Sequence, residues 1–171
     1  METRMQPESG IETVPSQFDQ LVRSVRVGNL ITMNERGPFG SHVPFLMGEN
    51  WSRLYIHVSG LALHTQNLRR DPRVSLFVTE PDEPRKNPLA LQRINLQGEA
   101  HLLSEHDGSY QRIKAAYLER FPQSKLMFGF ADFSLWELRM SFAHFVAGFG
   151  AAYYAFGKKP SEWIHQQPEK K

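Results

Sequence analysis

The chain has 171 residues, of which 40% are hydrophobic and 12% aromatic, enough for one folded domain with a hydrophobic core. The 20 Lys and Arg residues nearly balance the 18 Asp and Glu residues, so the formal net charge of +2 gives no electrostatic argument for nucleic acid binding. The absence of cysteine excludes disulfides, thiolate catalysis and Cys-ligated metal sites. The sequence shows neither an apolar run of membrane-spanning length nor a secretory signal pattern, so we expect a soluble cytoplasmic protein.

The N-terminal part predicts a tail, a helix and a hairpin, in that order. Residues 1–14 are polar and predict a flexible tail. Apolar residues at three- and four-residue spacing predict a helix over 15–25. A β-prone run at 30–33, the turn residues 35–38 and an extended segment at 41–47 then predict a hairpin.

The middle of the chain changes from a strand to a helix and back to a strand. Residues 53–59 (RLYIHVS) alternate apolar and polar side chains, which predicts a strand with two different faces. Residues 61–70 have helical spacing, and Asp71-Pro72 ends that helix. Residues 73–79 form an almost continuous apolar run and predict a further strand.

The C-terminal part predicts three strands, one helix and a tail. We expect strands at 91–103, 133–138 and 144–156 and a helix at 110–121. Within the predicted C-terminal tail, 158–171, Ser161 is expected to cap a short helical turn.

About seven short strands joined by hairpin turns favour a mainly β fold over a doubly wound α/β sheet. We expect a β-barrel with peripheral helices, occupying residues 15–157. The exposed strand edges and the many aromatic residues of such a barrel predict a homodimer built through the barrel face.

The junction between the strand at 53–59 and the following helix offers several hydrogen-bond donors. The first backbone N–H groups of a helix are unpaired and suit a phosphate. Ser59, His64 and Asn67 would add side-chain donors around such an anion. The alternative is structural: Ser59 caps the helix, His64 packs against a strand and Asn67 lies on the surface.

The other polar candidates each leave two interpretations open. Seven histidines show no closely spaced pair on one element, so they do not favour a structural metal site. His57 lies on the polar side of its strand. It faces either a ligand or the subunit interface, or it is an ordinary histidine that is solvated or packed in the core. Arg93 lies in a β-prone stretch, where it either anchors an anionic group or faces solvent.

Several motifs resemble those of a known superfamily. Three of them occur in order, SHVPF at 41–45, LYIHVSGLALHTQNL at 54–68 and DPRVSL at 71–76. Together they resemble the pyridoxamine 5′-phosphate oxidase-like split-barrel superfamily. Three later segments, RFPQS at 120–124, FADFSLWEL at 130–138 and VAGFGAA at 146–152, are similar to its haem-utilisation (HugZ-type) branch.

The resemblance implies a dimeric split β-barrel of the FMN-binding type, with a ligand groove between the subunits. In flavin-binding members FMN lies along the second and third strands, and its phosphate meets the strand–helix corner. The positions that the resemblance assigns to FMN are Ser41, His42, Val43, Pro44, His57, Val58, Ser59, His64, Thr65, Asn67 and Arg93.

Three functions follow from these observations. A flavin-dependent oxidoreductase is expected first, with FMN as the electron carrier. The chain shows no nucleophile motif, P-loop or dinucleotide fingerprint, which fits this function and the two that follow equally. The second is a haem-binding, haem-degrading protein, in which His165 ligates the iron, Arg93 pairs with a propionate and Asp132 accepts the other N–H of the ligand. The third is a split barrel that binds a small ligand without catalysis.

Overall fold

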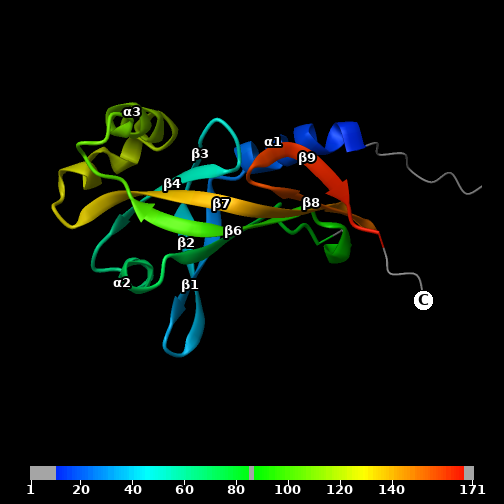
Figure 1. Ribbon diagram of the computed structural model, residues 1–171, viewed down its shortest axis with the longest axis horizontal. Coiled ribbons are helices and arrows are strands. Elements are labelled where there is room, and N and C mark those ends of the chain that lie inside the picture. The colour runs from blue at the N-terminus through cyan, green and yellow to red at the C-terminus, as the bar shows by residue number, and fades with distance from the viewer. Residues whose placement is uncertain (1–10, 85–86, 168–171) are drawn as a thin grey trace, which may run out of the picture.

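The computed structural model describes residues 11–84 and 87–167, in which nine strands form one curled antiparallel sheet (Figure 1). The strands are β1 (Val27–Asn34), β2 (Gly37–Pro44), β3 (Leu46–Met47), β4 (Arg53–Ser59), β5 (Arg73–Thr79), β6 (Arg93–Leu102), β7 (Phe133–Gly148), β8 (Ala151–Phe156) and β9 (Lys159–His165). Their order in the sheet is β2-β1-β5-β6-β7-β4-β3, and β8 joins β7 to β9. The expected mainly β split barrel is confirmed.

The barrel is split because of the length of β7, a strand of 16 residues. Strand β6 pairs with one edge of β7 along most of its length. The other edge is shared, because β4 pairs with residues 133–139 and β8 with residues 142–148. The strands on that edge therefore diverge at the middle of β7.

A glycine in β6 permits the bend of the sheet. The register between β6 and β7 shifts at Gly98, where a β-bulge interrupts the ladder. A Cβ atom added at Gly98 would lie 2.0 Å from the backbone oxygen of Arg139. Only glycine allows this close approach of the two backbones.

Helices cover two faces of the sheet. They are α1 (Val14–Ser24), α2 (Leu63–Arg70) and α3 (Tyr110–Arg120), with short 3₁₀ turns η1 (Ile11–Thr13), η2 (Pro88–Ala90), η3 (Pro122–Lys125) and η4 (Met127–Gly129). Helix α1 packs Phe18, Leu21 and Val22 into the main core inside the curled sheet. There the ring of Phe18 lies edge-on to that of Phe145, with centroids 5.7 Å apart.

A second apolar cluster lies beneath α3. Tyr110, Ile113 and Tyr117 of α3 pack with Tyr55 of β4 and Leu135 of β7. Strand β4 is therefore buried on both faces, by the main core on one side and by α3 on the other.

The C-terminal segment differs from the sequence prediction. The single strand expected at 144–156 is wrong, because β7 ends at Gly148 and Gly150, with φ of +76°, forms part of a turn before β8. The helical turn expected after Ser161 is also wrong, because these residues form β9. Pairing with β8 and burial of the Trp163 side chain, which is 6% exposed, hold this part of the expected tail in the sheet.

The N-terminal tail was expected at 1–14. Residues 1–10 lie outside the described part of the chain, residues 11–13 form η1, and Val14 begins α1 with a buried side chain. No helix within the described residues is long and apolar enough to span a membrane.

Candidate functional site

The corner between β4 and α2 is tied to the start of β7. The Ser59 hydroxyl donates a hydrogen bond of 2.5 Å to the Asp132 carboxylate and accepts one of 3.1 Å from the Leu61 N–H. The Gly60 N–H donates to the backbone oxygen of Asp132 at 2.6 Å. The residue preceding α2 is Ala62, and no side chain in the described part of the protein caps this helix start.

Helix α2 carries buried polar side chains behind that corner. Asn67 is 1% exposed, so it is not the surface residue of the structural interpretation, and its Nδ2 donates to Thr32 Oγ1 at 2.9 Å. Within residues 11–84 and 87–167, His64 Nε2, Thr65 Oγ1 and Asn67 Oδ1 have no hydrogen-bond partner. Burial lowers the pKa of His64, which favours its neutral form.

His57 is covered by aromatic rings. Its imidazole stacks on Phe128 of η4, with centroids 3.7 Å apart and planes 7° from parallel, and Tyr117 lies edge-on at 6.0 Å. Burial, with a smaller contribution from Lys114, lowers the pKa of His57 to about 4. His57 is therefore a neutral, packed side chain at pH 7. No three His, Asp or Glu side chains of the described residues gather as metal ligands.

The β2 positions that the resemblance assigns to FMN divide between two faces. Ser41 donates to the Leu30 backbone oxygen at 3.4 Å, and His42 Nδ1 lies 3.1 Å from Asn29 Oδ1. Val43 and, on β4, Val58 point into the main core, with exposures of 2% and 5%. The side chains of these two valines are therefore occupied by packing. Pro44 accepts a hydrogen bond of 3.5 Å from the Tyr117 hydroxyl.

Arg93 lies in a pocket near the end of β7 opposite to the β4–α2 corner. Its Nη1 donates to the backbone oxygens of Leu89 and Leu91, and it forms no ion pair with any residue in the described ranges. The pocket has a volume of about 570 Å³. Its lining includes Arg93, His144 and Gln166. His144 Nε2 and Gln166 Oε1 are hydrogen-bonded at 2.9 Å.

Sequence analysis missed His144 and Phe149 as lining residues of this pocket. Phe149 stands at the β7–β8 turn and is 78% exposed. The Gly148-Phe149-Gly150 sequence was the available signal, since two glycines around one aromatic residue mark a turn as well as a close approach of strands.

His165 and Asp132 are not neighbours within one chain. His165 pairs with Tyr153, which pairs with Phe145, whereas Asp132 directly precedes Phe133 at the start of β7. Twelve positions of β7 separate the two places, or about 40 Å of extended strand. Figure 1 shows the start of β7 and the red strand β9 at opposite ends of the molecule.

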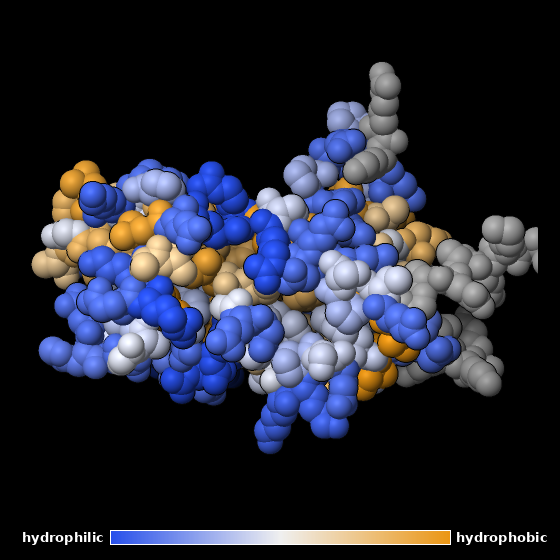
Figure 2. Space-filling model, turned by 90° about the horizontal axis from the view of Figure 1, so that it is seen from above, coloured by the Kyte–Doolittle hydropathy of each residue, from blue (hydrophilic) through white to orange (hydrophobic). Residues whose placement is uncertain are grey.

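The end of the molecule near α3 exposes apolar side chains. Leu61, Leu126 and Phe130 have exposures of 79%, 68% and 46%. Figure 2 shows apolar residues gathered at this end, on the left of the view, beside a mostly hydrophilic surface.

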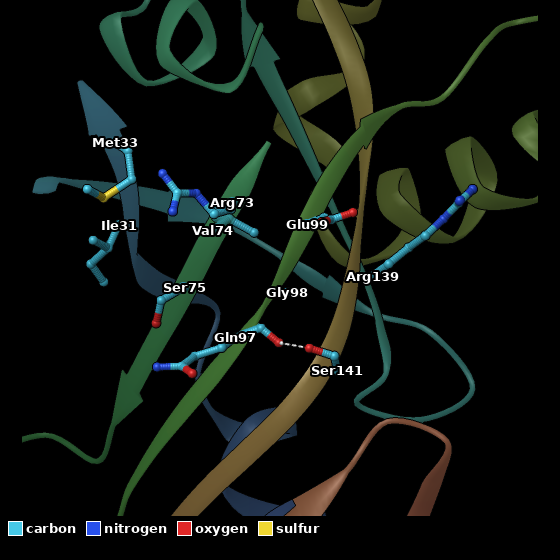
Figure 3. Close-up of a pocket in the computed structure, with 10 residues that line it drawn as sticks. All are labelled: Ile31, Met33, Arg73, Val74, Ser75, Gln97, Gly98, Glu99, Arg139 and Ser141. Carbon is cyan, nitrogen blue, oxygen red and sulfur yellow. Dashed lines mark hydrogen bonds between the residues drawn. The ribbon is translucent and has the colours of Figure 1, made fainter. Parts of the chain in front are cut away.

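The outer face of the sheet holds another hollow, of about 520 Å³, across β1, β5, β6 and β7 (Figure 3). Arg73, Glu99 and Arg139 form one cross-strand row of alternating charge, because each is paired in register with the next. Ser141 donates to the Gln97 backbone oxygen at 3.3 Å beside this row. This hollow was not predicted from sequence, since it depends on the pairing of four strands.

With this geometry in place, residues 12–165 match the CREG β-barrel family. The chain belongs to this family. The match covers every strand of the CREG-type sheet, so the expected split-barrel relationship is confirmed.

Curated relatives of this CREG-family chain carry names that refer to haem. It is 32% identical over 125 residues to a chloroplastic heme oxygenase, HOZ, of Arabidopsis thaliana, a match covering 73% of this chain and 36% of HOZ. It is 28% identical over 140 residues to heme oxygenase HutZ of Vibrio cholerae, covering 80% of this chain and 77% of HutZ.

A solved structure is similar over most of the chain. The heme binding protein from Mycobacterium smegmatis has 28% sequence identity and a TM-score of 0.76, and the match covers 92% of this chain and 61% of that one. The chain thus spans about a third of HOZ and three fifths of the mycobacterial protein.

Proposed function

We propose that this chain binds haem and takes part in haem degradation, in a site that two copies of the chain build together. The observation that carries the proposal is the pocket at Arg93. There an arginine that has no acidic partner among residues 11–84 and 87–167 shares the lining with apolar side chains, next to the end of β9. The relatives named heme oxygenase favour haem over the flavin-dependent oxidoreductase that the sequence led us to expect first.

The residues of this pocket suit a flat apolar ring that carries carboxylates. Val146, Phe149, Ala151 and Ala152 offer apolar surface. The Arg93 guanidinium is held by two backbone oxygens and keeps other N–H groups for an anionic group such as a propionate. Bound haem would supply the iron chemistry with oxygen, while the chain supplies position and charge.

His165 is the proposed iron ligand, although it does not itself line the pocket: its ring packs against that of Tyr153, with centroids 5.0 Å apart. Its Nδ1 lies 3.1 Å from the amide nitrogen Nε2 of Gln167. For Nε2 to keep a lone pair for iron, Nδ1 must carry the proton, and that N–H needs a hydrogen-bond acceptor. In the two-chain site that acceptor would be Asp132 of the second copy, in place of Gln167.

A second copy would bring Asp132 to this histidine. In one chain Asp132 precedes β7, whereas His165 lies in β9 near the other end of β7, so only a neighbouring chain can place Asp132 beside His165. The apolar end with Leu61, Leu126 and Phe130 and the alternating row Arg73–Glu99–Arg139 are uncovered surfaces that a homodimer would bury.

Haem titration of the purified chain tests this function. We expect saturable binding with a Soret band that shifts in His165→Ala, and weaker binding in Arg93→Gln. Loss of the Soret band with ascorbate and oxygen would separate a haem-degrading enzyme from a haem carrier. If the chain instead binds FMN and shows no saturable haem binding, the haem function is wrong.

A further inference from the structure

The turn between β7 and β8 presents an aromatic side chain at the Arg93 pocket. Gly148 is paired in register with Ala151, so the loop consists of Phe149 and Gly150 alone. Gly150 has a φ of +76°, a conformation that the second position of such a turn leaves to glycine. Phe149 lines the pocket and is 78% exposed, so a ligand there can reach its ring. Small and polar residues are usual in tight turns, whereas a phenylalanine gains most when a ligand removes it from water.

A row of side chains across three strands forms part of the same lining. Arg93 of β6 is paired in register with Val146 of β7, and Val146 with Ala152 of β8. Side chains paired in this way point to the same side of a sheet, and all three residues line the pocket. The row therefore places a positive charge at one end and apolar side chains beyond it. Leu89, which is 63% exposed, adds a second large apolar side chain to the lining.

The histidine proposed for iron lies outside this lining. His165 is paired in register with Tyr153, against whose ring it packs, and Tyr153 belongs to the main core. The contacts that Phe149, Val146 and Arg93 offer to a flat ligand are thus separate from the iron ligand. These contacts are with the ring and its carboxylates, which a porphyrin has with or without a metal.

We propose that Phe149 and Arg93 recognise the porphyrin itself, so that the pocket binds the ring whether or not it holds iron. The proposal rests on the haem-binding function for the class of ligand. Phe149 would pack on the ring, and Arg93 would pair with a propionate. Protoporphyrin carries both propionates on one edge and is apolar over the rest of its periphery, which matches a lining with Arg93 on one side and apolar side chains on the other.

Fluorescence titration of the full chain with iron-free protoporphyrin IX tests the proposal, because this porphyrin emits light and haem does not. We expect saturable binding to the wild type and the same affinity in His165→Ala. Phe149→Ala should weaken the binding about tenfold or more, since it loses both apolar burial and ring packing. Phe149→Tyr keeps a ring and should bind like the wild type.

Two controls separate the ring contact from other effects. Phe156→Ala is the matched variant, because Phe156 is also an exposed phenylalanine, at 52%, but lines a different hollow. The dimethyl ester of protoporphyrin IX keeps the ring without its charges, so it should bind more weakly than the free acid and be insensitive to Arg93→Gln. Equal melting temperatures of ligand-free Phe149→Ala and Phe149→Tyr would show that the turn folds without the ring.

The outcomes distinguish this proposal from the haem function. Recognition of the ring by Phe149 is overturned if Phe149→Ala binds protoporphyrin like Phe156→Ala, or if His165→Ala no longer binds it. A wild-type chain that binds haem but not protoporphyrin would also overturn it and would leave the haem function intact. Protoporphyrin binding that depends on Phe149, without saturable haem binding, would support recognition of the ring and overturn the haem function.

Discussion

Ser59 and Asp132, 73 positions apart in sequence, are joined by a hydrogen bond of 2.5 Å from the Ser59 hydroxyl to the Asp132 carboxylate. The backbone bond between Gly60 and Asp132 lies next to it. The corner between β4 and α2 is therefore held by Asp132, the residue directly before β7.

Removing the carboxylate should loosen that corner. Asp132→Ala loses the charge-assisted acceptor for Ser59, and we expect the free energy of unfolding to fall by about 1 kcal/mol. Urea unfolding measures this value, and Asp82→Ala, in an exposed loop, is the control. Equal unfolding midpoints for the two variants would show that the bond contributes nothing to stability.

His57 should make the stability depend on pH. Folding lowers its pKa from 6.5 to about 4, so between these values the unfolded chain holds the extra proton and the folded chain does not. Stability is therefore highest above pH 6.5 and falls as the pH drops towards 4. We expect the contribution to be about 1–2 kcal/mol after allowance for solvent screening.

Replacement of the imidazole isolates this contribution. His57→Phe keeps a ring against Phe128 and removes the titrating group, so its unfolding free energy should depend less on pH between 6.5 and 4. His106→Gln, at an exposed position, should keep the wild-type dependence. The interpretation fails if the pH profile of His57→Phe overlays that of the wild type.

Gly98 should not tolerate a side chain. In Gly98→Ala the new Cβ would meet the Arg139 backbone oxygen, and separating the strands should cost about 2 kcal/mol or more. Gly40→Ala is the matched control, because a Cβ at Gly40 meets nothing within 4 Å. Thermal unfolding of the two variants checks this difference, and similar melting temperatures would contradict it.

Local sequence patterns were sufficient to predict a strand or a helix end where the signal lies within a few neighbouring residues. The alternation in RLYIHVS predicted β4 correctly, and Asp71-Pro72 marked the end of α2 correctly. The same alternation did not reveal that His57 is covered, because the covering side chains Tyr117 and Phe128 come from more than fifty positions away. Long-range packing, rather than the strand itself, determines the environment of His57.

The C-terminal strand shows a second limit. Ser161 has the side chain of a helix cap, yet 159–165 form β9 because β8 offers a free edge and Trp163 fills the main core. Neither the free edge of β8 nor the space that Trp163 fills in the main core can be recognised from residues 159–165 alone. Likewise, Arg93 and Gln166 meet in one pocket only because β6, β7, β8 and β9 are paired in this order.

The most direct test of the two-chain haem site is complementation between two variants. In a dimer of one His165→Ala chain and one Asp132→Ala chain, one site would keep His165 from one chain and Asp132 from the other. We predict that this mixed dimer binds one haem with wild-type affinity and Soret position, whereas the Asp132→Ala homodimer binds about 10–100-fold more weakly and the His165→Ala homodimer loses the ligand band. A mixed dimer that binds haem no better than the Asp132→Ala homodimer would contradict the account.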